Sequence, residues 1–590
     1  MCGIFSIVGL KKVNINDLVL KQFMSQQHRG PDSSHLQRIQ DNVVFGFHRL
    51  AIIDPHKRSN QPLIGSFSTL ICNGEIYNYR ELIQKYNFKP KTGSDCEVIV
   101  LLYEKFGMER TIQEIQGEFA FVLHDTKTNC TFAARDHVGV RRMKYHVDQS
   151  SSRIVFSSER VPGILDMSEF PPGHFFKISF AENVFDWCAT NYVSTCRVFN
   201  EQESINYTRQ RTCTEIRGLL TNAVKQMMHS DRPIGVLLSG GLDSSLIASL
   251  AVKYHNSKQK LLFFTIGLKD SVDVQWAKKV AAFLKIPKDQ HIIYTFTPEE
   301  GIAAIPKVIE RLGTCDITTI RASVPQYLLA KYIREHTNVK VILSGEGSDE
   351  LFGGYRYSKD APNADVLHQD AVSLINQISY FDCLRSDGTL AAHGLEMRAP
   401  FLYKPLVDFV LTKMPKEFRL YQLTADGHML GKTILRDAFA PHACKIGEKS
   451  ISDTKDVSKK QDCKCSGPKF VYLPHNILQR PKEAFSDAVS SKEVSWYKTL
   501  QKHVDTLISG QEFQNICGSG GGDSKTSDQK YFHPDYLKPT TKEALYYRMQ
   551  YETYWGPVTE KTLPRFWMPK FQPESVLKSQ DPSATVLPSF

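Results

Sequence analysis

The sequence of 590 residues contains no stretch of about 18 consecutive apolar residues, and its N-terminus has no basic segment followed by an apolar one. We therefore expect neither a membrane-spanning helix nor a secretory signal peptide. It also has no long run of lysine or arginine, although its net charge is +10. Because the basic residues are scattered among 63 acidic ones, nucleic-acid binding is not the first interpretation. A mildly basic surface still suits an anionic small substrate.

The cysteines lack the spacing of a disulfide framework or a zinc site. There are thirteen of them, an odd number, spread over a long chain. Cys463 and Cys465 form a C-x-C pair, but no C-x-x-C or histidine pair accompanies them. A loop with free thiols is therefore favoured over zinc. Reduced thiols and the missing signal peptide together predict a cytosolic protein.

The length predicts two or more domains. In residues 1–190, short apolar or β-branched runs indicate an antiparallel sheet structure with a few helices, one of them at Asp95–Tyr103. Asn73-Gly74 and Val138-Gly139 are expected to form turns or loops. The predicted strands are Cys2–Val8, Val43–Leu50, Leu70–Cys72, Ala120–His124, Cys130–Ala134 and Ile154–Ser157.

From about residue 210 the pattern changes to strands alternating with helices, which predicts a parallel sheet covered on both faces. From about residue 355 onward the chain is expected to be largely helical. Segments 445–470 and 516–530 are polar or Gly/Ser-rich and are expected to be flexible insertions. The predicted helices are Thr214–Met228, Asp243–Tyr254, Val272–Leu284, Thr297–Glu310 and Val324–Glu335, and the strands are Ile234–Leu238, Leu261–Ile266, Gln290–Ile293 and Val339–Leu343.

Cysteine is the second residue of the chain. Initiator methionine is generally removed before a small side chain, and its removal would leave Cys2 with a thiol and a free α-amine. The thiolate is the reactive form of cysteine, and an α-amine with a pKa of about 7.7–8.0 can accept the thiol proton. On position alone, an ordinary buried cysteine is the alternative.

Polar clusters elsewhere in the first 190 residues could complete a site around Cys2. An arginine such as Arg49 can bind a carboxylate with two hydrogen bonds. The Asn73 amide beside the Gly74 N–H offers the donor pair of an oxyanion hole. Asp95 could bind an ammonium group, and His28–Asp32 is a turn-rich segment. Taken singly, Arg49 could pair with any carboxylate, and Asn73-Gly74 could be a plain hairpin turn.

In this order and spacing, these residues resemble the class II glutamine amidotransferase domain. The resemblance implies the four-layer αββα fold of N-terminal-nucleophile hydrolases, and hydrolysis of glutamine to glutamate and ammonia. It implies that Cys2 is the nucleophile and its own amine the base. Asn73 and Gly74 would stabilise the oxyanion, and Arg49 and Asp95 would hold the glutamine carboxylate and ammonium. The implied glutamine-binding set is Arg49, Leu50, Ile53, Asn73, Gly74, Glu75 and Asp95.

The second half of the chain contains two glycine-rich turns that follow predicted strands. The first, Ser239–Ser245, reads SGGLDSS and opens a helix, so its backbone N–H groups can approach an anion. It is not a Walker loop, because GxxxxGK[ST] is missing. The second, Ser344–Glu350, lies where ligands of open α/β sheets bind. Asp243 and Asp349 are candidate Mg²⁺ ligands, with helix caps as the alternative.

The strand–SGGLDSS–helix unit resembles the PP-loop of ATP pyrophosphatases. The two domains together, 1–190 and 210–570, resemble the glutamine-hydrolysing asparagine synthetase family over nearly the whole chain. The motifs that carry this resemblance are MCGI, HRGPD, HRLAIID, NGEIYN, LLSGGLDSS, DITTIRAS, LSGEGSDELFGGY, AAHGLEMRAPFL, RPKEAFSD, TKEALYYR, WMPK and a C-terminal DPSATVL.

The family resemblance implies amidation of aspartate through a β-aspartyl-adenylate, with glutamine and ATP-Mg²⁺ as co-substrates and an intramolecular ammonia tunnel. Glu346 would stabilise the adenylate, and Arg321 and Lys482 would face substrate or phosphate charge. The implied adenosine contacts are Leu237, Ile266, Ser344 and Gly345. The implied pyrophosphate contacts are Ser239, Gly240, Gly241, Asp243, Ser244 and Ser245.

Several residues depart from the family pattern without removing an expected functional group. They put catalytic efficiency and substrate preference in question. Two other interpretations stay open: a β-lactam synthetase-like enzyme that adenylates another carboxylate, and a non-catalytic regulatory paralogue. A homodimer is also left open. The departures are Arg142-Met143 for Pro-Leu, Gly313 and Cys315 for Glu and Tyr, Gly388 for a basic residue, Tyr403 for Asp, and Ala488 for Gly.

Overall fold

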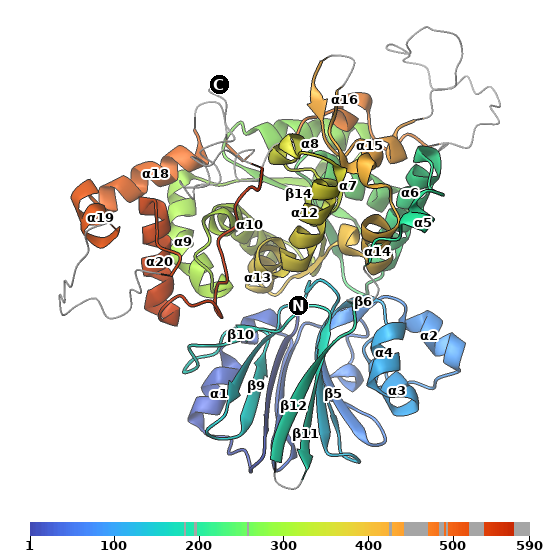
Figure 1. Ribbon diagram of the computed structural model, residues 1–590, viewed down its shortest axis with the longest axis vertical. Helices are drawn as coiled ribbons and strands as arrows, with labels where there is room; N and C mark the ends of the chain where they lie inside the picture. Colours follow the sequence, from blue (N-terminus) through green and yellow to red (C-terminus); the bar gives the residue numbers. More distant parts are fainter. Residues whose placement is uncertain are drawn as a thin grey trace.

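The computed structural model describes residues 1–181, 184–193, 198–255, 259–423, 427–441, 470–482, 489–490, 494–517 and 536–571. A β-sandwich forms one half of the molecule and a larger, mainly helical half packs against one end of it (Figure 1). The expected insertions 445–470 and 516–530 lie almost wholly outside the described residues. Within the described ranges, no helix combines the length and the apolar character needed to cross a bilayer.

The N-terminal half consists of two six-stranded sheets in which every pairing is antiparallel. The first has the order β10-β8-β9-β1-β3-β2, and the second β12-β11-β7-β6-β5-β4. The strands are β1 Gly3–Gly9, β2 Ser33–Gln40, β3 Val43–Arg49, β4 Leu63–Ile64, β5 Ser68–Ile76, β6 Gly117–Asp125, β7 Cys130–Arg135, β8 Lys144–Asp148, β9 Arg153–Ser157, β10 Ser168–Glu169, β11 His174–Ala181 and β12 Val184–Asn191.

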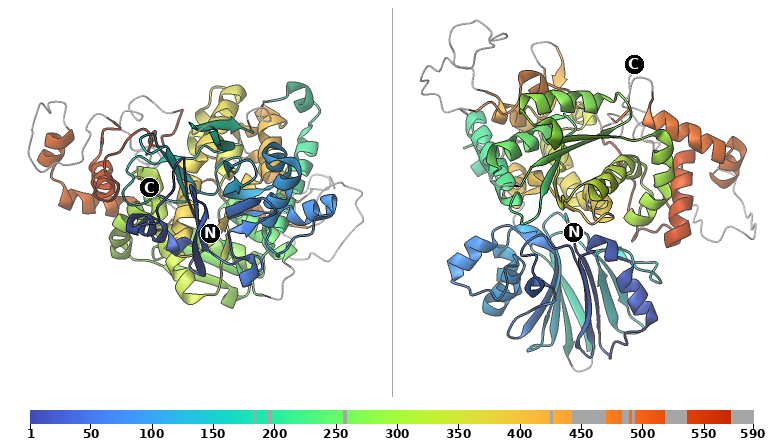
Figure 2. Two further views of the ribbon diagram at one scale, coloured as in Figure 1. Left: turned by 90° about the horizontal axis from the view of Figure 1, so that it is seen from below. Right: turned by 180° about the vertical axis from the view of Figure 1, so that it is seen from behind.

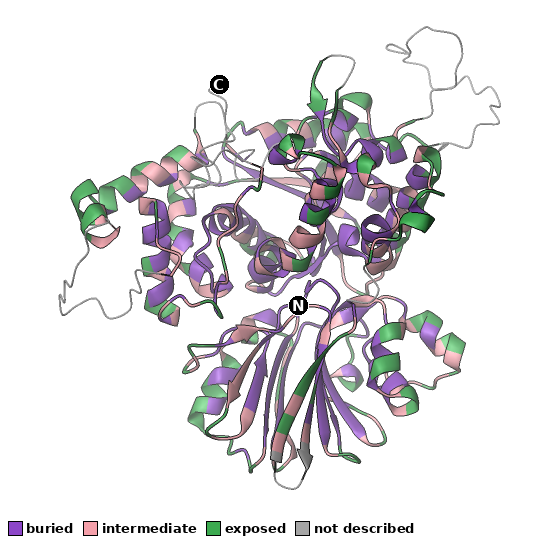
Figure 3. Cartoon of the chain, in the orientation of Figure 1, coloured by how far each residue is buried: buried purple, intermediate pink, exposed green. Residues whose placement is uncertain are grey.

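Side-chain alternation along the strands divides this half into four layers. In β1, Ile4 and Val8 face the core between the sheets, whereas Phe5 and Ile7 face the outer core that contains α1. The second sheet is covered by three helices. The predicted αββα fold is therefore confirmed, and buried residues line both faces of its central strands (Figure 3). The helices are α1 Asp17–Met24, α2 Tyr79–Tyr86, α3 Glu97–Phe106 and α4 Met108–Glu114.

The C-terminal half is built on a five-stranded parallel sheet with the order β15-β14-β13-β16-β17. Helices surround this sheet, as Figure 2 shows. The strands are β13 Ile234–Leu237, β14 Leu262–Gly267, β15 His291–Thr295, β16 Val341–Leu343 and β17 Glu396–Arg398. A short hairpin is formed by β18 Gln422–Leu423 and β19 Met429–Leu430.

The described helices of this half differ widely in length. They are α5 Glu201–Ser204, α6 Arg209–Met227, α7 Leu242–Tyr254, α8 Val272–Phe283, α9 Pro298–Leu312, α10 Ile317–His336, α11 Ser348–Phe352, α12 Ala364–Gln377, α13 Asp382–Ala391, α14 Lys404–Thr412, α15 Thr433–Phe439, α16 His475–Leu478, α18 Trp496–Leu507, α19 Gly510–Cys517 and α20 Lys542–Trp555.

Two elements correct the sequence predictions. Asn73-Gly74 is not a turn, because both residues lie inside β5 and pair with Ala120 and Phe119 of β6. Helix α10 begins seven residues before the predicted Val324, because the Asp316 side chain caps it by accepting from Thr319 N at 2.8 Å.

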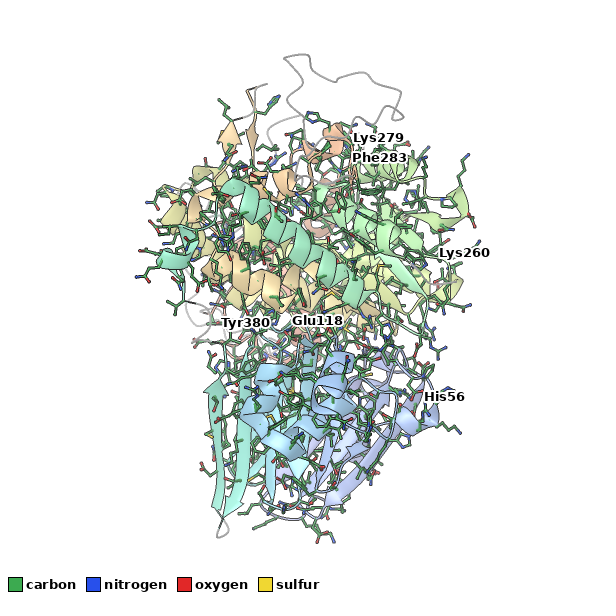
Figure 4. All side chains as sticks on the ribbon, turned by 90° about the vertical axis from the view of Figure 1, so that its right-hand side faces the viewer. His56, Glu118, Lys260, Lys279, Phe283 and Tyr380 are labelled. Atoms are coloured by element: carbon green, nitrogen blue, oxygen red, sulfur yellow. The ribbon has the colours of Figure 1, made fainter. Side chains whose placement is uncertain are left out.

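The two halves share one apolar core. Met1, Leu50 and Val140 of the sandwich belong to the same buried cluster as the residues of the parallel sheet. The N-terminus therefore lies between the domains (Figures 1 and 2). Glu118, which lies at this boundary in Figure 4, pairs with Arg141 at 2.9 Å and accepts from Ala399 N at 2.9 Å.

Candidate active sites

Cys2 lies at the end of the sandwich that faces the second domain, directly before β1. The Leu50 N–H donates to Cys2 Sγ at 3.4 Å, and Sγ lies 3.7 Å from Leu50 O. Arg29 Nε donates to the Cys2 carbonyl at 2.9 Å, which fixes the backbone. Burial raises the pKa of the Cys2 thiol to about 11. The thiol therefore needs a base nearby before it can act as a nucleophile.

Met1 fills the space next to Cys2. Its amino group is buried and donates to Leu395 O, across the domain boundary, at 3.0 Å. Arg141 Nη1 lies 3.2 Å from the Met1 sulfur. Burial lowers the pKa of the Met1 amine to about 5. While Met1 is attached, the Cys2 nitrogen is part of a peptide bond and cannot accept the thiol proton.

Arg49 is positioned entirely by neutral oxygens. Its Nη1 donates to His56 O at 2.9 Å and to Asn60 Oδ1 at 2.7 Å, and its Nη2 donates to Asp54 O at 2.6 Å. The structure shows no carboxylate in ion-pair contact with Arg49 among the residues it describes. The alternative in which a protein carboxylate neutralises Arg49 is therefore not supported. The guanidinium keeps its charge for an anionic ligand.

The Asn73 amide, on β5, is fully buried, and neither its Oδ1 nor its Nδ2 has a hydrogen-bond partner in the described structure. A buried amide without partners is costly unless a ligand uses it. Asp95 Oδ2 accepts from Ile76 N at 2.7 Å, and burial raises the pKa of Asp95 to about 6. Glu75, two residues after Asn73, pairs with Arg398 of the second domain at 3.2 Å.

The second site is a cavity of about 880 Å³ at the carboxyl ends of the parallel strands. Strands β13 and β16 are neighbours, and the chain leaves β13 toward β14 on the other side, so their loops meet at a topological switch point. Ser348 Oγ donates to Asp243 Oδ1 at 2.7 Å across this gap. The predicted residues that line the cavity are Leu237, Ser239, Gly241, Asp243, Ser244, Ile266, Arg321, Ser344, Gly345, Glu346, Asp349 and Lys482.

Two predicted ATP contacts, Gly240 and Ser245, are not part of the cavity wall. Gly240 has φ +75, and an added Cβ would lie 2.4 Å from Ala277 N, so glycine is required for the turn itself. Ser245 is fully buried in α7, one residue beyond Ser244. The structure thus gives Gly240 a role in shaping the loop, whereas Ser239, Gly241 and Ser244 reach the cavity.

Lys432 is a site residue that the sequence analysis missed. Its ammonium lies 2.8 Å from Asp243 Oδ2 and 2.6 Å from Asp349 Oδ1, so it bridges the two glycine-rich loops. Lys482 also pairs with Asp349, at 2.7 Å. Although burial acts the other way, these two lysines hold the pKa of Asp349 below its usual value. No motif distinguishes Lys432 in the sequence, because only folding brings it to the loops.

Glu346 and Arg321 have protein partners that were also not predicted. Glu346 Oε2 pairs with Arg385 at 2.6 Å, and its Oε1 accepts from Ser386 Oγ at 2.8 Å. Burial raises the pKa of Glu346. Arg321 Nε donates to Glu543 of α20 at 2.7 Å, so Arg321 lines the cavity while a carboxylate behind it fixes its position.

The donor set fits a Mg²⁺ ion only if a substrate supplies further oxygens. Among the described residues, no group of three or more His, Cys, Asp or Glu side chains could hold a metal. Asp243 and Asp349, however, already converge on one cation, the Lys432 ammonium. One or two carboxylates plus phosphate oxygens is the usual magnesium environment.

The residues that depart from the family pattern lie away from both reacting centres. Tyr403 Oη donates to Gln116 Oε1 at 3.0 Å and accepts from Asn222 at 3.2 Å, so it joins the two domains. Gly313 ends α9 with φ +66, and Cys315 is buried in the core. Ala488 lies outside the described residues. None of the described departures lines the large cavity.

Fold and sites define the class: an N-terminal-nucleophile sandwich with a cysteine at position 2, joined to a parallel-sheet domain with a PP-loop-like turn beside a large cavity. The glutamine amidotransferase domain profile matches residues 1–179, and the asparagine synthase profile matches 215–370 and 359–444. The chain belongs to the glutamine-hydrolysing asparagine synthetase family.

Full-length relatives carry the family assignment. The chain is 37% identical over 610 residues to a probable asparagine synthetase [glutamine-hydrolyzing] of Acanthamoeba polyphaga mimivirus, covering 100% of both chains. It is 34% identical over 617 residues to the asparagine synthetases [glutamine-hydrolyzing] of Mus musculus and of Homo sapiens, covering 100% of this chain and 99% of each relative.

Proposed function

We propose that this protein converts aspartate to asparagine, using ATP and ammonia released from glutamine, with AMP and pyrophosphate as the other products. The observation that supports the proposal is that one chain, whose two halves share one apolar core, holds both the Cys2 end of the sandwich and the large cavity of the parallel sheet. The sandwich holds the partly buried Cys2 thiol and the fully buried Asn73 amide, which has no hydrogen-bond partner in the described structure, and the second domain holds the large cavity.

In the first half-reaction, the Cys2 thiol loses its proton to its own α-amine once Met1 is removed, and the thiolate attacks the glutamine amide carbon. The Asn73 amide and the Gly74 N–H stabilise the oxyanion that develops. Arg49 binds the substrate carboxylate, and Asp95 and Glu75 lie on the side of its ammonium. The tetrahedral intermediate then collapses: the C–N bond breaks, nitrogen takes the proton from the α-amine, and ammonia leaves toward the domain boundary where Met1 lies in this structure. Water hydrolyses the remaining thioester, which releases glutamate and the Cys2 thiol.

In the second half-reaction, the backbone at Ser239–Ser244 and the Lys482 ammonium bind the phosphates of ATP. The β-carboxylate of aspartate attacks the α-phosphorus, and pyrophosphate leaves. Asp243 and Asp349 would hold Mg²⁺, which supplies charge neutralisation for the phosphate oxygens. Glu346 faces the cavity beside Ser344 and accepts a proton when ammonia attacks the acyl-adenylate.

The test compares Cys2→Ala with the unchanged protein, using asparagine, AMP and pyrophosphate as readouts. We expect the variant to lose glutamine-dependent synthesis and to keep synthesis from added ammonium chloride, because the two sites use different residues. Equal loss of both activities in a folded variant would contradict the two-site assignment.

The same assay separates the open alternatives. A β-lactam synthetase-like enzyme would release AMP with another carboxylate and not with aspartate. A regulatory paralogue would form neither product from any nitrogen source.

We also place the protein in the cytosol, because the nine described cysteines are all free thiols. The homodimer remains an expectation, to be checked by the mass of the protein in solution.

A further inference from the structure

A second cavity, of about 120 Å³, lies between the two domains and away from both reacting centres. Its wall is formed by the end of α1, the segment that follows β9, and the C-terminal ends of α9 and α20. Three arginines contribute to its wall. The residues that line it are Ser25, Arg142, Glu159, Arg160, Pro162, Glu310, Arg311, Gly313 and Trp555.

Arg160 is the central side chain of this cavity. The residue is only 3% exposed, yet its Nε and Nη2 have no hydrogen-bond partner in the described structure. Its Nη1 donates to Leu165 O at 3.1 Å, and its guanidinium lies 5.8 Å from the centre of the Tyr551 ring. These contacts compensate part of the cost of burial. Arg160 is thus a buried cation that lines a cavity and has two N–H donors without a partner.

Arg142 and Arg311 add two further positive charges to the wall. Arg142 donates to Arg311 O at 3.2 Å and to Leu312 O at 2.9 Å, whereas its Nε has no partner. Arg311 Nη1 lies 3.1 Å from His28 Nδ1, so this contact uses one nitrogen of the guanidinium. Two backbone carbonyls thus hold the Arg142 guanidinium in place, and Glu159 lies 3.5 Å from it.

The carboxylates near the cavity are already bound to other cations. Glu159 pairs with Arg29 at 3.0 Å and with His28 at 3.1 Å, and it lies 3.5 Å from Arg142. Glu310 pairs with Lys307 at 2.7 Å. Among the described residues, no carboxylate lies within ion-pair distance of Arg160. Arg160 is therefore a buried cation in the cavity wall that no carboxylate of the described chain neutralises.

Gly313 keeps the space beside Arg160 open. A Cβ at this position would lie 3.1 Å from Arg160 Cδ and 3.2 Å from Nε, and its φ of +66 disfavours other residues. A volume of this size has room for several water molecules. A carboxylate or phosphate group also fits, and unlike water it would neutralise the charge.

We propose that this cavity is a binding site for a small oxyanion, a carboxylate or phosphate group, that bridges the two domains through Arg142, Arg160 and Arg311. The first two arginines come from the sandwich and the third from the end of α9. Helix α10 begins four residues after Gly313 and carries Arg321 to the nucleotide cavity. An oxyanion bound in this cavity therefore strengthens the domain interface at a point close in sequence to the synthetase site. Such a bound anion is suited to act as an effector of that site.

Calorimetric titration with inorganic phosphate and with succinate tests this site. The full-length protein is first saturated with a non-hydrolysable ATP analogue and Mg²⁺ so that the large cavity is filled, and ionic strength is kept constant with chloride. We expect saturable binding at one site per chain, weakened at least tenfold by Arg160→Gln and unchanged by Arg110→Gln. Arg110 is a matched control because its side chain is 52% exposed on α4. Binding of phosphate alone or of succinate alone identifies the source of the oxyanion.

A second variant keeps the test decisive if Arg160→Gln does not fold. Ser25 lines the same cavity, so Ser25→Glu supplies a tethered carboxylate. We expect this variant to lose binding of both probes and to unfold at a higher temperature than the unliganded parent. Absence of saturable binding in the parent, or equal binding in the parent and in both variants, would show that the cavity holds water only. Asparagine synthesis is measured in parallel, so failure of this site is distinguishable from failure of the proposed function.

Discussion

Single residues at the chain start decide whether the glutaminase can work. A thiol with a pKa of about 11 is ionised in only about one molecule in ten thousand at pH 7. Met1 also keeps the Cys2 nitrogen in an amide, so no amine is available to accept the thiol proton. Removal of Met1 would supply the base and would also empty the space between Cys2 and Leu395 that Met1 now fills.

We predict that protein retaining Met1 has no glutaminase activity and gains it as methionine aminopeptidase removes this residue. Mass spectrometry measures the loss of Met1, and glutamate release measures the activity in the same samples. Ammonia-dependent synthesis is the control, since the nucleotide cavity contains no residue from the N-terminus. Full glutaminase activity before any Met1 is removed would contradict the role of the amine.

Glu346 is the residue whose charge should matter most in the second half-reaction. Burial raises its pKa, whereas Arg385 at 2.6 Å acts to keep it ionised. Glu346→Gln retains the shape and the hydrogen bond with Ser386. We predict normal glutamine hydrolysis and ATP binding, and a 10²- to 10⁴-fold loss of asparagine formation from either nitrogen source. Asparagine output within a few-fold of normal would show that Glu346 only supports the loop.

At the scale of elements, the proposed oxyanion site lies where two strands of the sandwich approach closely. A Cβ on Gly74 of β5 would lie 2.3 Å from Glu118 O and 2.6 Å from Phe119 Cα of β6. We predict that Gly74→Ala separates these strands, lowers stability by about 1–3 kcal/mol and reduces glutaminase activity at least tenfold. Denaturant titration and glutamate release measure the two effects.

A matched glycine on α6 gives the control for Gly74→Ala. Gly218 is exposed in the middle of this helix, and a Cβ there would meet no atom within 4 Å. Gly218→Ala should therefore stabilise the protein by about 0.5–1 kcal/mol and leave both activities unchanged. Similar effects of the two substitutions would show that the strand contact at Gly74 is unimportant.

Local sequence patterns predicted the elements well where one pattern was dominant. The strands around Cys2 and the βα units near Leu237 and Ile266 have apolar runs bounded by glycine, and the structure confirms them. The turn predicted at Asn73-Gly74 is wrong, because both residues are fully paired with β6 although their residue types favour turns. Strand β17 and Lys432 have no local signal, since each acquires its role only from long-range contacts.

At the scale of the whole molecule, Arg142 of the sandwich places its charge against the second domain. Its guanidinium occupies the space beside Gly388 of α13. A Cβ on Gly388 would lie 3.0 Å from Arg142 Nη1. The cation that faces Glu159 and the end of α9 is thus supplied by the other domain.

A double-mutant cycle tests whether Arg142 and position 388 share one charge site. Gly388→Lys places a second buried cation against Arg142 and should cost about 3 kcal/mol or more, the size associated with an uncompensated buried charge. Gly388→Met matches the bulk without the charge and should cost less. Combining Gly388→Lys with Arg142→Met restores a single cation and should recover most of the lost stability and of the coupling between glutamine hydrolysis and asparagine formation. Denaturant titration and the ratio of glutamate to asparagine produced measure the two quantities. If the effects of the single substitutions simply add, Arg142 and position 388 do not share one charge site, and the two domains are held together independently of it.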